Sequence, residues 1–276
     1  MSNKIIIASV VVLYNPTELD LQNVLQMAYY FKHVWVYDNS SNNNLYKRYF
    51  GDSHFTYISF DINNGLAIPY NLAIKAATES GIKWLMLLDQ DSFISREGID
   101  NINDYVSKCN DKTIAIVAPQ INYGRYFNCI SEDKKVKWVI NSGATLNLSL
   151  LNEYNIRFDE NYFLDRLDAD FDNQISDKRL TIIQLKKSIL EQRLGEESGF
   201  RHTNHSAVRH YYIFRNRFYY NAKYYKGIHK IFLNLSQTIR HIVLILLFED
   251  NKIQKLHCLP LAFSDYRKKI YGKKIL

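Results

Sequence analysis

Two carboxylates one residue apart end an apolar run in the sequence. The stretch from Lys83 to Ser92 reads KWLMLLDQDS, and its aspartates are Asp89 and Asp91. Residues i and i+2 of an extended chain point to the same side, so both carboxylates can reach one site where a strand ends. Carboxylate oxygens are ligands that Mg²⁺ and Mn²⁺ prefer, with phosphate oxygens and water completing the shell. The pair therefore predicts a divalent cation site, and a solvated turn is the alternative.

A second group of acidic residues lies in the segment RFDENYFLDRLDADFDNQ. Its members are Asp159, Glu160, Asp165, Asp168, Asp170 and Asp172. We expect a helix from Leu164 onward, in which Asp165, Asp168 and Asp172 share one face. Like charges this close raise the pKa of one member, which suits a general base near neutral pH. An acidic helix start favoured by the helix dipole is the alternative.

The elements that would position these carboxylates alternate between strands and helices. The apolar runs IIIASVVVLY, HVWVYD, FTYISF and WLMLLD predict strands, and TELDLQNVLQMAYYF and IPYNLAIKAATESG have helical spacing. Thr17 is expected to cap the first helix and Gly81 to end the second. This alternation predicts an α/β fold with a mainly parallel sheet flanked by helices.

Ligands of such sheets bind beyond the carboxyl ends of the strands. The residues expected there are rich in Asp and Asn, and they are Tyr14-Asn15, Asp38-Asn39, Asn63-Asn64-Gly65 and Asp89-Gln90-Asp91. This predicts a polar crevice. Neither GxGxxG after the first strand nor GxxxxGK[ST] occurs, so a dinucleotide fold and a P-loop are not supported. Phosphate bound here would need help from a metal.

The composition indicates a globular protein of a reducing compartment. Hydrophobic residues make up 47% and charged residues 23% of the 276-residue chain, and its three cysteines form no CxxC pair. The apolar N-terminus runs into Tyr14-Asn15-Pro16 without a small-residue cleavage site, so we expect a buried strand there and not a signal peptide. The segment HIVLILLF is too short to cross a membrane.

The C-terminal third is basic and aromatic. The formal net charge is +7, and the stretches YYIFRNRFYYNAKYY and YRKKIYGKK flank apolar residues with a helical period. Such helices favour attachment to an anionic membrane surface, and the alternative is that they pack as core against the sheet. No helix-turn-helix, zinc-finger or RNP pattern accompanies them, so we expect no nucleic-acid partner.

Seven segments in this order resemble the family 2 glycosyltransferases with a GT-A fold, and among them the bacterial rhamnosyltransferase-like group. They cover most of residues 5 to 220 and read VVVLYNP, VYDNSS, NNGLAIPYNLAI, WLMLLDQDS, NSGATLNLSLL, FDENYFLDRLDADF and RHYYIFRN. The resemblance implies a GT-A glycosyltransferase domain over residues 1–220 and a basic, amphipathic helical region over residues 221–276. It also implies inverting transfer from a nucleotide sugar with Mg²⁺ or Mn²⁺.

The resemblance assigns roles to individual residues. Asp168 would be the catalytic base, and Asp89 and Asp91 would hold the metal. The donor would be bound by Tyr14, Asn15, Asp38, Asn39, Asn64, Gly65, Asn71, Asp89 and Gln90. The acceptor or sugar pocket would be lined by Asn141, Ser142, Gly143, Asp165 and Asp170, and the diphosphate would be contacted by Arg209 and Arg215. A conformational glycine is the alternative for Gly143, and stacking on tyrosine is the alternative for the arginines.

One position departs from the pattern. Relatives commonly read HxLG and use the histidine as a metal ligand, whereas this chain reads QRLG with Gln192. Glutamine is a feeble ligand. We expect the metal to be held by Asp89, Asp91, phosphate and water, or to gain His202 or His205 from the next loop.

The resulting hypothesis is a glycosyltransferase of bacterial surface polysaccharide (O-antigen or capsule) synthesis. dTDP-L-rhamnose is the preferred donor, and a galactofuranosyl or hexosyl donor carried on UDP is the alternative. The acceptor would be a saccharide or a lipid-diphosphate-linked saccharide, which implies a cytoplasmic enzyme in peripheral contact with the inner face of the plasma membrane. Two other classes stay open: a nucleotide-sugar-binding protein without catalysis, and an adapter for membranes or polyanions.

Overall fold

The computed structural model describes residues 5–41, 44–124, 127, 129–192, 197–198 and 202–274. Its internal contacts divide the chain into two compact units, and each is described here by itself. The sheet unit consists of Met1–Phe158 and Phe171–Arg193, and the helical unit consists of Asp159–Asp170 and Leu194–Leu276.

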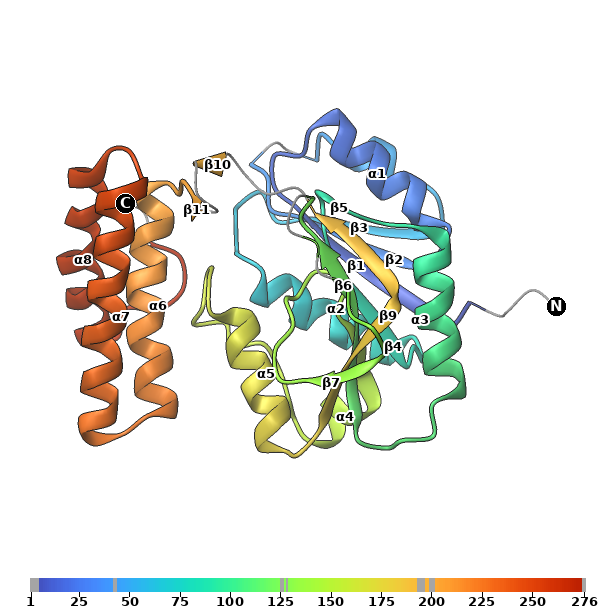
Figure 1. Cartoon of the computed structure of the whole chain (residues 1–276). Coiled ribbons are helices and arrows are strands. Elements are labelled where there is room, and N and C mark those ends of the chain that lie inside the picture. Colours follow the sequence, from blue (N-terminus) through green and yellow to red (C-terminus); the bar gives the residue numbers. More distant parts are fainter. Residues whose placement is uncertain are drawn as a thin grey trace. The chain divides into compact units, whose positions relative to one another are not determined.

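One mixed sheet runs through the sheet unit (Figure 1). Its described strands are β1 (Ile7–Leu13), β2 (Val34–Asp38), β3 (Phe55–Ser59), β4 (Trp84–Asp89), β5 (Ser92–Ile94), β6 (Ile114–Asn122), β7 (Lys134–Val136), β8 (Thr145–Asn147) and β9 (Thr181–Gln192). Their order is β3-β2-β1-β4-β8-β6-β9-β5, and β7 pairs with β9. Parallel pairing from β3 to β4 brings the carboxyl ends of these four strands to one edge.

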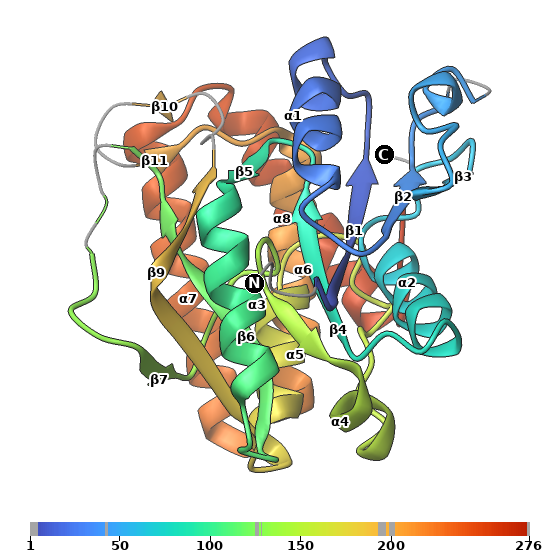
Figure 2. The same cartoon turned by 90° about the vertical axis from the view of Figure 1, so that its right-hand side faces the viewer.

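Helices cover both faces of this sheet (Figure 2). They are α1 (Glu18–Ala28), α2 (Ala67–Glu79), α3 (Arg96–Lys108), α4 (Leu148–Glu153) and α5 (Leu167–Asp177), with a 3₁₀ turn, η1, at Lys47–Tyr49. α1 and α3 contribute to one apolar core with alternate side chains of β1 and β4. α2 and α4 contact each other, and α2 also contacts β1 and β4. The residues of α5 up to Asp170 belong to the helical unit.

The local signals in the sequence are confirmed. Thr17 caps α1, and its backbone N–H and hydroxyl both donate to Asp20, while its hydroxyl oxygen accepts from the Asp20 N–H. Gly81 follows the end of α2 with φ +71°, a conformation that glycine adopts without strain. The α/β class is confirmed as well, although the sheet becomes mixed beyond β4. There the short β8 runs antiparallel to both β4 and β6.

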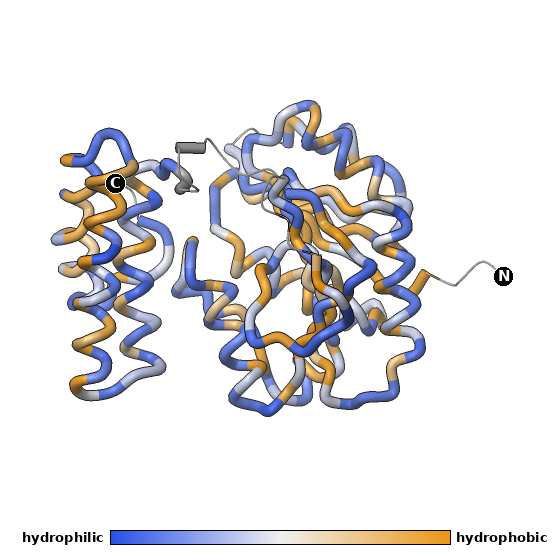
Figure 3. The backbone as a smooth tube through the Cα atoms, viewed as in Figure 1, coloured by the Kyte–Doolittle hydropathy of each residue, from blue (hydrophilic) through white to orange (hydrophobic). Residues whose placement is uncertain are grey.

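Three long helices form most of the helical unit. They are α6 (Ala207–Tyr224), α7 (Gly227–Phe248) and α8 (Lys252–Arg267), and two short strands, β10 (Glu197–Ser198) and β11 (His202–Thr203), precede them. α6 and α7 are antiparallel, because Asn221 bonds to Asn234 in the first half of α7, whereas Arg217, one turn earlier in α6, bonds to His241 further along α7. The tube in Figure 3 shows many apolar residues along these helices.

One expectation about this region needs correction, and the expected domain border stays a prediction. The apolar segment expected to be short is part of α7, which has 22 residues and is long and apolar enough to cross a membrane by length and composition. The expected border between residues 220 and 221 falls inside α6, whereas the compact units divide the chain elsewhere. That residues 1–220 carry the catalytic activity stays a prediction.

Gly143 provides a test of this packing. It has φ +82°, and an added Cβ would lie 2.6 Å from Cγ of Pro119 and 2.8 Å from Cδ1 of Leu190. We expect Gly143→Ala to lower the free energy of unfolding by about 1–3 kcal/mol or more, through backbone strain and overpacking. Gly51→Ala is the matched control, since an added Cβ there meets nothing within 4 Å. Urea unfolding followed by circular dichroism measures both, and equal stability of the two variants would contradict the account.

Candidate active site

Asp89 is the last residue of β4, and its carboxylate is held by two other elements. The side-chain N–H of Gln192 donates to Oδ2 at 3.1 Å, and the Tyr70 hydroxyl lies 3.5 Å from Oδ1. Burial raises the pKa of Asp89 to about 6, and the charge of Asp91 adds to this rise. A cation placed between the two carboxylates would relieve that repulsion and favour the ionised form.

Gln90, between the two aspartates, ties the end of β4 to the end of β1. Its side-chain oxygen accepts from the Tyr14 backbone N–H at 2.8 Å, and its side-chain nitrogen donates to the Tyr14 carbonyl at 3.3 Å. The side-chain amide of Gln90, which is expected to contact the sugar donor, is therefore hydrogen-bonded to the backbone of Tyr14. The Tyr14 side chain remains 51% exposed, so it is accessible to a planar ligand.

The loop after β2 is organised by two buried polar side chains. Asp38 accepts from the Ser40 backbone N–H at 2.8 Å and from the Tyr57 hydroxyl at 2.6 Å. The Ser40 hydroxyl in turn accepts from the backbone N–H of Asn15 at 2.7 Å. These bonds join the ends of β1, β2 and β3, as their neighbouring places in the sheet require.

The segment before α2 is bound to the same loop. The Asn39 side chain donates to the Gly65 carbonyl at 2.8 Å and accepts from the Asn64 backbone N–H at 3.1 Å. Asn39, Asn64 and Gly65, all expected at the donor, therefore lie together. Asn71 is used differently, because its amide forms two hydrogen bonds with the backbone of Phe158. It braces the chain just before the acidic segment.

The segment before β8 lies beside Asp89. The Ser142 hydroxyl accepts from the Asp89 backbone N–H at 3.3 Å and lies 2.7 Å from the Ser92 hydroxyl. The Asn141 carbonyl accepts from Ala144, which keeps this turn closed. The close approach at Gly143 is to Pro119 and Leu190, so the conformational role is the one that its surroundings support.

Asp89 and Asp91 fit a divalent cation with an incomplete set of protein ligands. Among the described residues, no group of three or more His, Cys, Asp and Glu side chains could hold a metal ion. Two adjacent carboxylates whose charges repel are nevertheless suited to a hard cation that takes its other ligands from phosphate and water. Of the two histidines considered as further ligands, His205 belongs to the helical unit and its N–H donates to Glu249, while the side chain of His202 lies outside the described residues.

The acidic segment does not form the expected helix from Leu164. Asp165 and Arg166 have φ angles of 56° and 67°, in the left-handed region, so α5 begins only at Leu167. Asp165 therefore does not share a helical face with Asp168. Burial raises the pKa of Asp165, against the opposing charge of Arg209 at 3.5 Å, and its Oδ2 atom has no hydrogen-bond partner.

Asp168 lies in the first turn of α5 and is partly exposed. Its Oδ1 atom accepts from the Ala169 backbone N–H at 2.7 Å. Asp170, by contrast, is fully buried and bonded to Lys223 at 2.7 Å and to the Tyr224 hydroxyl at 2.9 Å. α6 thus neutralises and covers this carboxylate, and the expected place of Asp170 in a sugar pocket stays a prediction that these contacts do not favour.

The two α6 arginines expected at the diphosphate differ in the same way. Arg215 has no exposed surface; its guanidinium donates to the Gly272 carbonyl at 2.7 Å and packs on the rings of Tyr211 and Tyr212. These contacts support the stacking alternative for Arg215, and its expected contact with a diphosphate stays a prediction that they do not favour. The Arg209 side chain is 51% exposed and remains accessible.

The sequence did not predict several of the contacts that these groups make, and Gln192 stood out there only as a departure from the metal-ligand pattern. Tyr70, Ser92 and Gln192 converge on Asp89 or on Ser142, and Lys223 and Tyr224 hold Asp170. All five lie far along the chain from the residues they contact. No local pattern marks such contacts.

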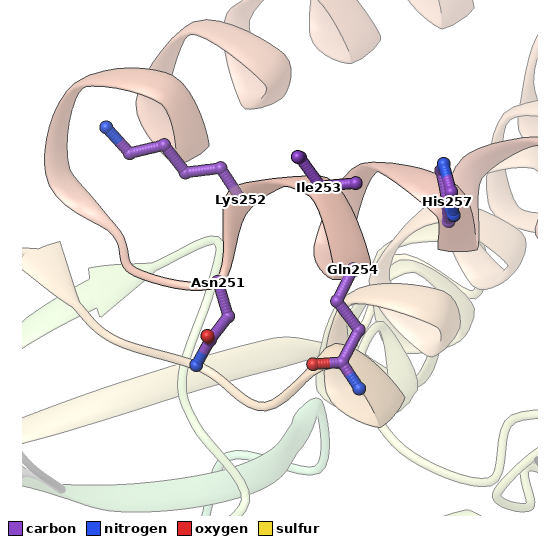
Figure 4. Close-up of a pocket in the computed structure, with 5 residues that line it drawn as sticks. All are labelled: Asn251, Lys252, Ile253, Gln254 and His257. Atoms are coloured by element: carbon purple, nitrogen blue, oxygen red, sulfur yellow. The ribbon is translucent and has the colours of Figure 1, made fainter.

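Three cavities lie away from the predicted site residues. One of about 1040 Å³ is at the amino ends of β1, β4 and β6, and one of about 410 Å³ lies beside α3. A third, of about 670 Å³, is a depression beside the start of α8 (Figure 4). Its lining side chains are exposed, and they are Asn251, Lys252, Ile253, Gln254 and His257.

The arrangement of the sheet unit agrees with a match to known proteins. The model of the family described as "Glycosyl transferase family 2" matches residues 15–164. The chain belongs to this family. A relative from Shigella flexneri, "dTDP-rhamnosyl transferase RfbF", is 24% identical over 295 aligned positions that cover 96% of this chain and 97% of the relative.

Solved structures share the fold of this glycosyltransferase. The Staphylococcus aureus TarS 1–349 complex with UDP-GlcNAc has a TM-score of 0.61 and 15% identity, covering 96% of this chain and 81% of that one. GalNAc-T7 with UDP, GalNAc and Mn²⁺ has a TM-score of 0.55 and 12% identity, covering 71% and 45%. The expected family and GT-A type of fold are therefore confirmed.

The contact between Gln192 and Asp89 yields a prediction about this glycosyltransferase. Its amide hydrogen bond favours the ionised carboxylate, so Gln192→Leu should move the pKa of Asp89 upward from about 6. Carboxyl ¹³C NMR titration measures this, with Asp89→Asn identifying the signal. Gln184→Leu is the control, because Gln184 is in the same strand and bonds to the Pro119 carbonyl. An unchanged midpoint in Gln192→Leu would show that the bond is not formed in solution.

The same pKa has two opposite consequences for pH dependence. Because it is raised above the ordinary value of 3.8, Asp89 stabilises the fold in its protonated form below about pH 4, and this contribution is lost as the pH rises through 6. Cation binding needs the ionised form. Affinity for Mn²⁺ should therefore fall as the pH drops below about 6, and calorimetry with the metal alone tests this.

Proposed function

We propose that this chain transfers a sugar from a nucleotide donor with inversion at the anomeric carbon. The observation that carries the proposal is the convergence of Asp89, the exposed Tyr14 and the Asn39–Gly65 contact at one edge of the sheet, within a family of glycosyltransferases. Tyr14 and Asn15 are proposed to contact the base. The loop at Asp38 and Asn39, with Asn64 and Gly65, is proposed to shape the donor site from backbone groups.

Asp89 and Asp91 would hold the metal, and Arg209 is proposed to contact a phosphate. A divalent cation such as Mg²⁺ or Mn²⁺ held by these carboxylates would supply positive charge that stabilises the leaving diphosphate. The Mn²⁺ in the GalNAc-T7 structure supports this choice of ion for the fold. The Ser142 hydroxyl accepts a hydrogen bond from the Asp89 backbone N–H, so Ser142 links the end of β4 to the proposed sugar pocket.

Asp168 is proposed as the base. The acceptor hydroxyl oxygen attacks the anomeric carbon, the bond from that carbon to the diphosphate oxygen breaks, and the hydroxyl proton passes to the carboxylate. Asp168 suits this role better than its neighbours, because Asp170 and Asp172 are buried and accept internal hydrogen bonds. Asp165 is proposed to assist through its nearby charge.

The proposed donor is dTDP-L-rhamnose, supported by the near full-length likeness to the Shigella dTDP-rhamnosyl transferase. The UDP-GlcNAc in the TarS structure supports a UDP sugar as the alternative donor. We propose a saccharide or lipid-diphosphate-linked saccharide of bacterial surface polysaccharide as acceptor. Such an enzyme would act in the cytoplasm, in peripheral contact with the inner face of the plasma membrane.

A nucleotide-sugar-binding protein without catalysis is the second candidate. Gln192 favours this candidate, because its side-chain N–H donates to the Asp89 carboxylate at a position where a metal ligand is expected. This candidate binds nucleotide without turnover, and the next two experiments separate it from the enzyme.

Nucleotide binding is the first test. Calorimetric titration with dTDP, UDP and GDP, with and without Mn²⁺, should show metal-dependent binding that prefers one nucleotide. Asp91→Ala should weaken it at least ~tenfold, because one of two charged ligands is lost. Asp100→Ala is the control, since that aspartate pairs with Arg96 on the surface of α3. Absence of binding to all three nucleotides would overturn the proposed donor site.

Turnover is the second test. Release of nucleoside diphosphate with a rhamnose-terminated or lipid-linked acceptor should fall ~10²–10⁴-fold in Asp168→Asn, while nucleotide affinity stays the same. Asp177→Asn, an exposed aspartate at the other end of α5, should behave as the wild type. Nucleotide binding without turnover in any of these proteins would favour the binding protein.

A further inference from the structure

α7 turns its polar face inward. Asn221 of α6 donates to Asn234 at 2.7 Å and to the side-chain oxygen of Gln237 at 3.2 Å. The Arg217 guanidinium donates to Nδ1 of His241 at 2.6 Å. Beside the buried Ile245, which packs in an apolar cluster with residues of α6, the contacts of α7 with α6 thus include amides, an imidazole and a guanidinium, where a helix of a water-soluble bundle usually places aliphatic side chains.

The opposite face of α7 is apolar and exposed. Eight large apolar side chains on it are between 44% and 85% exposed, and they are Ile228, Ile231, Phe232, Leu235, Ile239, Val243, Leu246 and Leu247. Of the described α7 residues in the apolar window, only 6% are buried. The steps from Ile228 through Phe232, Leu235 and Ile239 follow the helical period of about 3.6, so these side chains form a straight stripe. We call these eight residues the α7 stripe.

A buried network fixes the rotation of α7. Because arginine only donates, Nδ1 of His241 accepts from Arg217, and Nε2 of His241 must carry the hydrogen that reaches Nδ1 of His210 at 3.0 Å. Nε2 of His210 then donates to Glu249 at 2.7 Å, and Lys255 donates to the same oxygen at 2.8 Å. Turning the stripe inward would break this chain of bonds and leave buried charges unpaired, which is costly.

An apolar stripe of this size needs an apolar neighbour. The charges on the helical unit indicate which one. α7 contains no Asp or Glu but carries Lys230 and Arg240, and Lys226 precedes it. Further exposed cations in the same unit are Arg267, Lys268, Lys269 and Lys273. This distribution complements the anionic headgroups of a lipid leaflet.

The position of Arg240 indicates whether α7 lies in the plane of a membrane or crosses it. Its exposed side chain sits past the middle of α7, among the apolar residues of the stripe. A guanidinium at the centre of a bilayer is unfavourable, whereas at the level of the headgroups it reaches phosphate. The polar inner face of α7 would also have to leave α6 if the helix crossed the membrane.

We propose that α7 lies in the plane of an anionic bilayer leaflet, with the α7 stripe inserted at the acyl boundary and Arg240 at the phosphates. This deepens the peripheral membrane contact proposed above by naming its surface and its orientation. It does not depend on the nucleotide chemistry, and the experiments therefore separate a failure of one proposal from a failure of the other.

Vesicle binding by the full chain is the test. Flotation with phosphatidylglycerol–phosphatidylcholine vesicles should recover the wild-type protein, and Phe232→Ser combined with Leu235→Ser should lower the partition coefficient at least ~tenfold. Leu19→Ser with Ile62→Ser is the control, because these sheet-unit residues are 42% and 56% exposed. Unchanged far-ultraviolet circular dichroism and an unchanged urea unfolding midpoint show that the variants are folded. Equal binding of both double variants would overturn the proposal.

Two further measurements exclude other occupants and orientations. Sedimentation without lipid should give the same mass for wild type and the stripe variant, and a dimer that the variant dissociates would assign the stripe to a second copy. Spin labels at positions 228 and 246 should report similar shallow depths in vesicles. A shallow label at one position and a label across the bilayer at the other would establish a membrane-spanning helix and overturn the in-plane orientation.

Discussion

The central constraint on the candidate site is that two consecutive residues at the end of β4, Asp89 and Gln90, are tied to three different parts of the sheet unit. Gln90 is bonded to the backbone at the end of β1, Asp89 accepts from Gln192 at the end of β9, and the Asp89 N–H donates to Ser142 before β8. Because β4 pairs with β1 on one side and β8 on the other, a shift in register would break all of these contacts. The apolar strand and the polar site therefore depend on the same pairing.

The basic residues of α6 have an internal role that composition alone does not reveal. Lys223 bonds to both Asp159 and Asp170, and Arg209 lies beside Asp165. These cations offset the repulsion within a segment that would otherwise concentrate negative charge. The positive charge of the sequence is thus partly used to hold carboxylates, whereas the partly exposed Asp168 accepts from the Ala169 backbone N–H.

The sequence predicts features that depend on neighbouring residues and fails where burial depends on distant ones. Alternating periodicity locates the strands and helices, and Asp89 stands at the end of β4 because an apolar run ends there. Arg215 and Asp170 look like site residues in the sequence because they are charged and close to a motif. Their partners, Gly272 and Lys223, lie more than fifty residues away along the chain, and only the fold shows that both groups are buried.

α7 shows the same limit for helices. An apolar period of about 3.6 predicts that one face of a helix is buried in an apolar environment, but it does not say whether protein or lipid supplies that environment. Here the polar side chains face α6, and the bonds through His241 and His210 to Glu249 decide the rotation. The apolar face is left for a neighbour outside the described chain. An enzyme held to a leaflet in this way would meet acceptors that are themselves confined to that surface, which favours a lipid-linked saccharide over a free one.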